Sequence, residues 1–281
     1  MKKYELDGFI EYNFIKIARQ FRKAIVNFEP EHIHKFRADI KKLKVFFHLL
    51  SMESSDGLSY RITKKMKTIY GYLGIIHNLQ QQLKKVNEYV KESAPSVPVS
   101  YVSMLEKESI YWKKLTKDFV DTDYDFDNDK QEILVALPDK LTKRSIKKFI
   151  DYIVHEINMI SGRLDDDEAL DHIRKFMEDV YYNYEIIAPF MDQRQLNLFN
   201  QKSIEECLKF FDDFHDKCVA LALLKTFDTS GLNEPEKLLL KQMENEWVYK
   251  KNDVKNKLIA TLDSIMFRKM KGFAIAGITS E

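Results

Sequence analysis

The sequence predicts an all-α protein, and three observations lead to this fold class. Its 281 residues include only eight glycines and six prolines, and long stretches contain neither, so few positions interrupt a helix. Apolar residues recur at spacings of three and four, as they do on a helix that buries one face. Hydrophobic residues make up 44% of the chain and charged residues 32%, a composition that allows one large core or two smaller ones.

The first predicted helix covers about residues 6–27. Its buried side is expected to contain Ile10, Phe14, Ile17, Phe21, Ala24, Ile25 and Phe28. Basic residues gather on another side, at Lys16, Arg19, Arg22 and Lys23. Pro30 follows, and proline suits the first turn of a helix because the N–H groups there have no partner within the helix. We therefore expect the second helix to begin at this point.

The second helix carries two stripes on neighbouring faces along the stretch EHIHKFRADIKKLKVFFHLL, residues 31–50. The apolar stripe consists of Phe36, Ile40, Leu43, Phe47 and Leu50. The other stripe, which we call the basic ridge, consists of His34, Arg37, Lys41, Lys44 and His48. Like charges three or four residues apart destabilise a helix, and no acidic residue lies on this stripe. The basic ridge therefore predicts a polyanionic partner.

This helix resembles the signature helix of the conserved-histidine α-helical domain (CHAD) family. The pattern that carries the resemblance is His34-x-x-Arg37-x-x-x-Lys41-Lys42-Leu43-Lys44-x-Phe46-Phe47. The family usually has arginine at the positions of the three lysines, so the match is divergent there.

The third predicted helix, about residues 60–92, supports the same resemblance. Its first turns contain Arg61, Lys64, Lys65 and Lys67. Further along, residues 73–80 read LGIIHNLQ and are similar to the LGxxRDLD segment of the family, with His77, Asn78 and Gln80 in place of its charged residues.

The resemblance implies a fold of two pseudo-repeated antiparallel four-helix bundles. It also implies binding of inorganic polyphosphate along a basic surface, with no reaction and no cofactor. The charge distribution agrees, because residues 1–100 hold 18 Lys and Arg against 10 Asp and Glu, while residues 101–281 hold 27 against 34. The basic half of the chain is the half that contains the basic ridge.

A boundary between the two bundles is predicted near residue 127, giving units 1–127 and 128–281. A fourth helix at about 101–119 precedes the acidic stretch DTDYDFDND, residues 121–129. Acidic residues there, together with Glu132, match the ligand spacing of an EF-hand. Phe126, however, stands where that loop needs glycine for a sharp turn. We therefore interpret the stretch as an acidic linker and not as a calcium site.

The second half is expected to repeat the first in degenerate form. Residues 133–162 read as a helix or a broken helix with a basic patch at Lys140, Lys143, Arg144, Lys147 and Lys148. Asp165 to Asp167 read as an N-cap cluster. The helix that follows resembles the second signature helix of the family through Arg174, Tyr182 and Glu185, but Asp171 falls on its histidine position, and Glu178 and Tyr181 fall on basic positions. Further helices are expected at about 201–226 and 234–271.

The candidate polyphosphate-binding residues follow from the basic ridge, its neighbouring helices and the second signature helix. They are Arg19, Arg22, Lys23, His34, Arg37, Lys41, Lys44, Lys64, Lys65 and Arg174. Apart from Arg174, we expect these residues to converge on one face or to line the groove between the two bundles, with His34 at the edge.

Catalysis and metal binding are not predicted. The pair His215-Asp216 could belong to a metal site, but the seven histidines show no metal-ligand spacing. No glycine-rich phosphate loop or nucleophile motif is present. The sequence shows no signal peptide and no membrane span, and its two cysteines read as free thiols, so we expect a cytoplasmic location.

Three functions fit these observations. Binding of inorganic polyphosphate, or of a similar polyanion, explains the basic ridge, the basic half and the resemblance together. A protein-interaction scaffold with a decayed polyanion site would explain the degenerate second half. A non-specific nucleic-acid binder would use the same charges, but it should also show exposed aromatic residues or a recognition helix.

Overall fold

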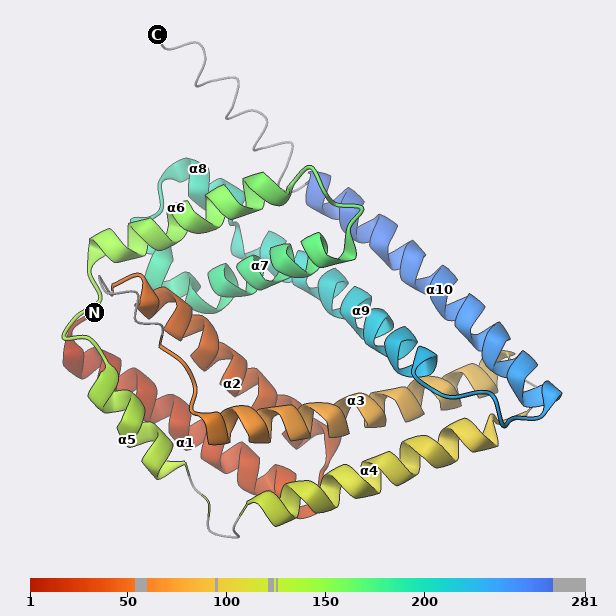
Figure 1. Cartoon of the computed structure of the whole chain (residues 1–281). Coiled ribbons are helices and arrows are strands. Elements are labelled where there is room, and N and C mark those ends of the chain that lie inside the picture. Colours follow the sequence, from red (N-terminus) through yellow and green to blue (C-terminus); the bar gives the residue numbers. More distant parts are fainter. Residues whose placement is uncertain (54–59, 94–95, 121–123, 125, 265–281) are drawn as a thin grey trace.

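The computed structural model describes residues 1–53, 60–93, 96–120, 124 and 126–264, and in this part of the chain the regular structure is helical, without strands (Figure 1). The predicted all-α fold is therefore confirmed. The elements in chain order are α1 (Lys3–Asn27), α2 (Pro30–Ser51), α3 (Lys64–Ser93), α4 (Val99–Phe119), α5 (Asp127–Ala136), α6 (Lys143–Ile160), α7 (Asp167–Ile187), the 3-10 helix η1 (Ala188–Phe190), α8 (Gln193–Leu198), α9 (Gln201–Lys225) and α10 (Glu234–Leu262).

Local sequence explains where several helices begin. Pro30 occupies the first turn of α2, as expected. The side chain of Asp166 caps α7 by accepting a hydrogen bond from the Glu168 N–H at 2.9 Å, so the acidic cluster before this helix acts as an N-cap. The apolar stripe of α2 is fully buried, from Phe36 to Leu50, and packs against the buried side of α1.

The helices form two similar sets, α1–α4 and α6, α7, α9 and α10. In the first set α1 packs on α2, α2 on α3 and α3 on α4. In the second set α6 packs on α7, α7 on α9 and α9 on α10. The sets join where α2 packs on α7 and where α3 packs on α9, so each junction pairs equivalent helices. This arrangement confirms the two pseudo-repeated helical bundles.

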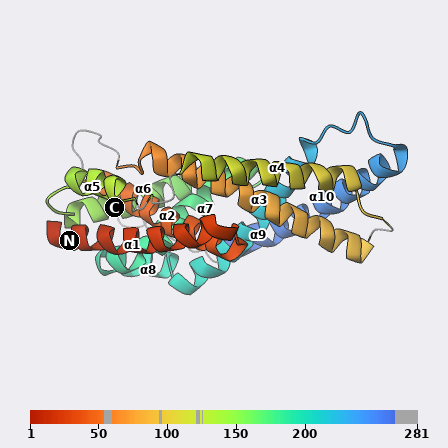
Figure 2. The same cartoon turned by 90° about the horizontal axis from the view of Figure 1, so that it is seen from below.

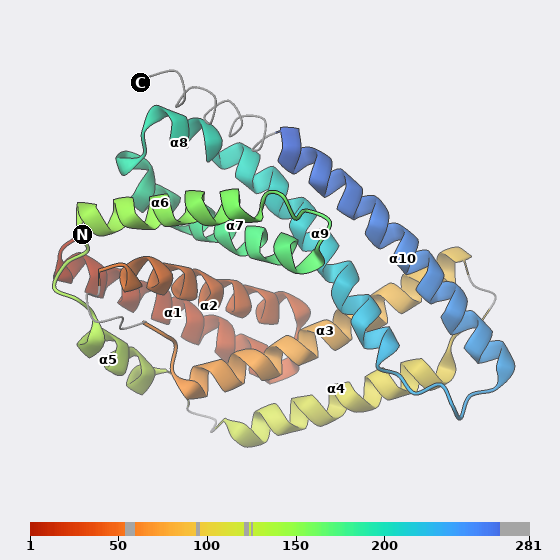
Figure 3. The ribbon, with the colours of Figure 1, turned by 45° about the horizontal axis from the view of Figure 1, so that its top comes forward.

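The buried apolar side chains form two clusters, and each cluster combines helices from both sets. One buried cluster joins α1, α2 and the first part of α3 to α5, α6, α7, most of α9 and the end of α10. The other joins the last part of α3 and α4 to the ends of α9 and α10 that meet them. Figure 2 shows that the molecule is thin when seen from its edge, and Figure 3 shows that α3 and α9 cross each other. The predicted boundary at residues 127 and 128 stays a prediction.

Some elements differ from the sequence-based expectation. The stretch predicted as one helix or a broken helix forms two helices, α5 and α6, separated around Pro138. The short elements η1 and α8 were not expected. The described part of the last helix ends at Leu262, and its expected continuation to residue 271 lies outside the described residues.

The acidic linker is described only in part. Asp121, Asp123 and Asp125, which were considered as calcium ligands, lie outside the described residues. Asp129 is buried, and its carboxylate accepts hydrogen bonds from the hydroxyl groups of Thr63 and Tyr124. Phe126 is fully buried and has a left-handed backbone conformation, with φ of 68°. Such a conformation is unfavourable for a side chain other than glycine, so the aromatic packing of Phe126 must compensate for it.

Candidate functional site

The basic ridge of α2 faces α3 on one side and α7 on the other. Arg37 donates a hydrogen bond through Nη1 to the Tyr70 carbonyl oxygen of α3, at 3.1 Å. Lys41 donates to Glu178 of α7, at 2.6 Å. The basic ridge therefore contacts a helix of its own set on one side and a helix of the other set on the other side.

Arg37, Lys44 and Tyr70 form the contact between the basic ridge and α3. The Arg37 guanidinium lies 4.6 Å from the centroid of the Tyr70 ring, and Lys44 Nζ lies 5.3 Å from it. A cation near an aromatic face is stabilised by the ring quadrupole. Gly74 leaves room for the Arg37 guanidinium, because a Cβ atom there would lie 2.1 Å from Arg37 Nη1. The glycine of the LGxxRDLD-like segment thus makes room for the arginine of the basic ridge.

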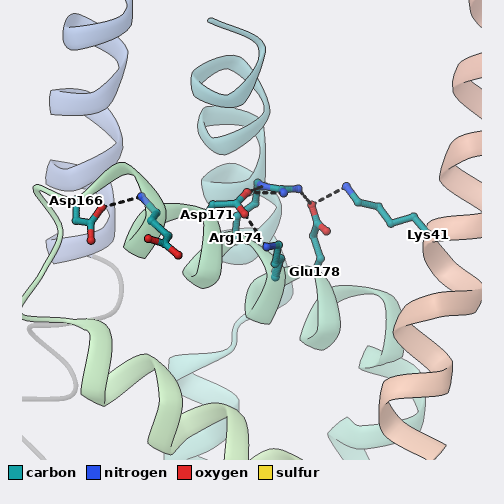
Figure 4. A network of polar contacts seen from close by, with 7 residues as sticks. Lys41, Asp166, Asp171, Arg174 and Glu178 are labelled. Carbon is teal, nitrogen blue, oxygen red and sulfur yellow. Dashed lines mark hydrogen bonds and ion pairs between the residues drawn. The ribbon is translucent and has the colours of Figure 1, made fainter. Parts of the chain in front are cut away.

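On the α7 side, the basic ridge meets an ion-pair network (Figure 4). Glu178 Oε1 accepts hydrogen bonds from Lys41 Nζ of α2 and from Arg174 Nη1 of its own helix, both at 2.6 Å. Arg174 also donates through Nη2 to Asp171, again at 2.6 Å. Burial alone would raise the pKa of Asp171, but hydrogen bonds from Lys175 and Arg174 outweigh it and lower this pKa to about 2.

A second link between α2 and α7 lies at the C-terminal end of the basic ridge. His48 Nδ1 lies 2.7 Å from Oδ2 of Asp179, whose side chain is 8% exposed. The hydrogen bond with Asp179 raises the pKa of His48 above its ordinary value. His48 is therefore already paired with a carboxylate of the same chain.

The other end of the basic ridge meets two histidines. His34 is exposed, and its ring centroid lies 6.0 Å from that of His77 of α3. Burial, followed by the positive charges of Arg37 and His34, lowers the pKa of His77 to about 4. Gln80, one turn further along α3, donates a hydrogen bond to the Phe28 carbonyl oxygen at 2.7 Å, which ties the LGxxRDLD-like segment to the connection between α1 and α2.

The predicted residues outside α2 do not join the basic ridge. Arg19 lies near Asp39, which is two residues from Arg37 and hence about 200° around the helix. The expected convergence is therefore wrong for Arg19: it faces nearly the opposite side of α2, because α1 packs against the helix on that side. Arg22 and Lys23 are exposed on α1, where Lys23 lies near Glu31.

The remaining predicted residues are Lys64 and Lys65 of α3 and Arg174 of α7. Lys65 Nζ lies 4.0 Å from the ring centroid of Tyr124, on the side toward α1 and the acidic linker. Lys64 is exposed in the first turn of α3. Arg174, the candidate from the second signature helix, is linked to the basic ridge through Glu178, which pairs with both Arg174 and Lys41.

Sequence reasoning missed the acidic partners of the basic ridge and its aromatic support. In the sequence, Glu178 falls on a basic position of the repeat, and nothing next to it indicates a pair with Lys41. The spacing of the two motifs could have indicated this pair. Lys41 and Glu178 are 137 residues apart, as are Arg37 and Arg174, so each pair occupies equivalent positions of the two repeats. Tyr70 carried no signal beyond its position one turn before Gly74.

Within the described ranges, no three or more His, Cys, Asp or Glu side chains are grouped so that they could hold a metal ion. His215 and Asp216 of α9 are both exposed there and belong to no such group. No described helix combines the length and the apolar character that crossing a membrane requires.

Comparison with known proteins shows similarity at the level of structure. No protein-family model matches the sequence, and no curated protein sequence matches it either. The structure is similar to the crystal structure of the CHAD domain from the plant Ricinus communis, with a TM-score of 0.61 and 11% identity over 94% of this chain and 87% of that chain. It is also similar to PptA from Streptomyces chartreusis, with a TM-score of 0.63 and 12% identity over 93% of this chain and 99% of that chain. The chain therefore has the fold of a CHAD domain, as the resemblance of its second and third helices predicted.

Proposed function

We propose that this protein binds inorganic polyphosphate, or a similar polyanion, without transforming it. The observation that supports this proposal is the placement of Arg37 and Lys44 together against Tyr70, where α2 meets α3. Arginine can donate to two phosphate oxygens at once, and lysine supplies a mobile positive charge. The CHAD-like fold agrees with a binding role.

The cations of this face are available to a ligand. In the part of the chain that the structure describes, Arg37, Lys44 and Lys67, which lies one turn before Tyr70 on α3, pair with no acidic side chain, and the two lysines are exposed. The six lysines of α10 contrast with them, because each forms an ion pair. A polymer with a phosphate at every repeat could contact several of the available cations in sequence and release its counterions.

An interaction scaffold is the second candidate, and a specific observation favours it. Glu178 neutralises Lys41, and Asp179 neutralises His48, so two members of the basic ridge are already paired within the chain. A scaffold would need no polyanion.

We also propose a cytoplasmic location, since both cysteines are free thiols.

The test is a double variant, Lys44→Gln with Lys67→Gln, which removes two available charges and keeps helix propensity. At roughly 1.5 to 3 kcal/mol for each charged hydrogen bond, the loss of two contacts should weaken long-chain polyphosphate binding on the order of 100-fold. Binding should also become less sensitive to salt. Isothermal titration calorimetry at several salt concentrations measures both effects.

The matched control is Lys147→Gln with Lys148→Gln, which removes two exposed cations from α6 that have no ion-pair partner among the described residues. This control should lose clearly less affinity. Equal losses would show that net charge, and not the α2–α3 face, governs binding. Absence of binding by the unmodified protein at low salt would leave the scaffold, and stronger binding of single-stranded DNA than of polyphosphate would favour a nucleic-acid binder.

A further inference from the structure

The ion pair between Lys41 and Glu178 joins equivalent positions of the two halves. A shift of 137 residues relates Lys41 to Glu178 and also relates Arg37 to Arg174. The helices that carry these residues, α2 and α7, pack against one another. Two equivalent positions can touch only near the axis that relates the two halves, so Lys41 and Glu178 lie at the centre of this junction.

The sign of the charge at position 178 determines what this centre can bind. Glu178 is 7% exposed at its side chain, and its Oε1 holds one cation from each half, Lys41 and Arg174. A lysine at this position would place three cations together, which is unfavourable unless an external anion neutralises them. A carboxylate supplies that negative charge from within the chain.

Acidic residues around Glu178 extend this effect toward α9. Asp212 of α9, which is exposed, lies near Glu178, Lys41 and Arg174. Asp179 lies beside Glu178 and is paired with His48. A polyanion that crossed from α2 to α7 would therefore meet carboxylates where α2 offers cations.

We propose that Glu178 is an internal anion that occupies Lys41 and Arg174 and confines a bound polyanion to the α2–α3 face. This inference rests on the proposed function and adds a residue that determines specificity. With Glu178 in place, the cations Lys41 and Arg174 at the α2–α7 junction are already paired. The α2–α3 side of the basic ridge is then the side that can bind a polyanion. A ligand phosphate must displace Glu178 before it can reach Lys41.

The experiment compares four proteins: unmodified, Glu178→Gln, Lys41→Gln and the double variant, with long-chain polyphosphate as the probe. Glu178→Gln should raise affinity at least about tenfold, since it frees Lys41 and the Nη1 group of Arg174 for phosphate, while Arg174 keeps its contact with Asp171. Lys41→Gln alone should change affinity by no more than about twofold, because Lys41 is already occupied. In the Glu178→Gln background, however, Lys41→Gln should remove most of the gain.

The control is Glu185→Gln, which makes the same change of charge at an exposed position of α7. It should raise affinity far less than Glu178→Gln, and an equal gain would overturn the proposal. If the unmodified protein binds and Glu178→Gln binds no better, the internal anion is rejected while the proposed function stands. If only Glu178→Gln binds, the proposed function fails and the internal anion stands.

A measurement on a second variant covers the case in which Glu178→Gln does not fold. Lys41→Gln can be compared directly with the unmodified protein, since the Lys41 side chain is 30% exposed and its removal leaves Glu178 paired with Arg174. A loss of tenfold or more in this variant would show that Lys41 contacts the polyanion directly, and the proposal would be overturned.

Discussion

His77 of α3 is held in an environment that opposes its protonation. Burial has the largest effect, and the positive charges of Arg37 and His34 from α2 add to it, while Asp216 of α9 acts in the opposite direction. The result is a pKa of about 4, below the ordinary value of 6.5. Nδ1 of His77 is buried and has no hydrogen-bond partner within the described residues, which agrees with a neutral ring.

This pKa predicts a loss of stability in mild acid. Between pH 6.5 and about 4 the unfolded chain binds a proton at His77 and the folded chain does not, so the free energy of unfolding should fall as the pH falls. The loss attributable to His77 should be at most about 3 kcal/mol. His77→Gln should remove this part of the pH dependence, as measured by urea denaturation at pH 7.5 and 4.5. Identical pH dependence in the two proteins would contradict the assignment.

At the scale of elements, the contact between α2 and α3 depends on one glycine. Gly74 leaves space for the Arg37 guanidinium, whereas Gly71, one turn earlier on the same helix, is exposed and has no atom within 4 Å of an added Cβ. The two glycines therefore occupy the same helix with different roles. Gly71 only lowers helix propensity, while Gly74 permits a hydrogen bond between elements.

Alanine at these two positions should change stability in opposite directions. Gly71→Ala should raise the free energy of unfolding by about 0.5 to 1 kcal/mol through helix propensity. Gly74→Ala should lower it on the order of 1 kcal/mol, because the gain in propensity is outweighed by loss of the charged hydrogen bond from Arg37 to Tyr70. Thermal and chemical denaturation of both variants would measure the difference. A stabilised Gly74→Ala protein would show that Arg37 can move without cost.

At the scale of the whole molecule, the two halves are complementary in charge and share their cores. The basic first half and the acidic second half meet through Lys41 with Glu178 and through His48 with Asp179. Both buried clusters contain side chains from both halves. Separation of the halves would expose the side of α2 that α7 covers and the side of α3 that α9 covers.

The intact chain is therefore expected to unfold in one cooperative transition. A protein consisting of residues 1–127 should show no comparable transition, since it would lack the helices that complete both clusters. Differential scanning calorimetry of the intact chain and of the fragment tests this expectation. A fragment with a sharp transition of its own would instead establish the predicted boundary as a boundary between independently stable units.

Much of the fold follows from patterns within single helices. The apolar stripe of α2, the proline at its start and the acidic cap of α7 were all predicted, because each depends on residues within a few turns of one another. The two short motifs of α2 and α3 also indicated the CHAD-like fold. By contrast, the short elements η1 and α8 have too few turns to show a helical period.

The candidate site was predicted in part, and the missing part depends on tertiary structure. The sequence by itself determined that His34, Arg37, Lys41, Lys44 and His48 share one face of a helix, since about 3.6 residues per turn place them there. Only the packing of α2 between α1, α3 and α7 decided that Arg19 lies on the far side, that Tyr70 supports Arg37 and that Glu178 neutralises Lys41. The physical reason is that helical periodicity specifies the direction of a side chain, whereas its partner depends on which distant helix covers that face.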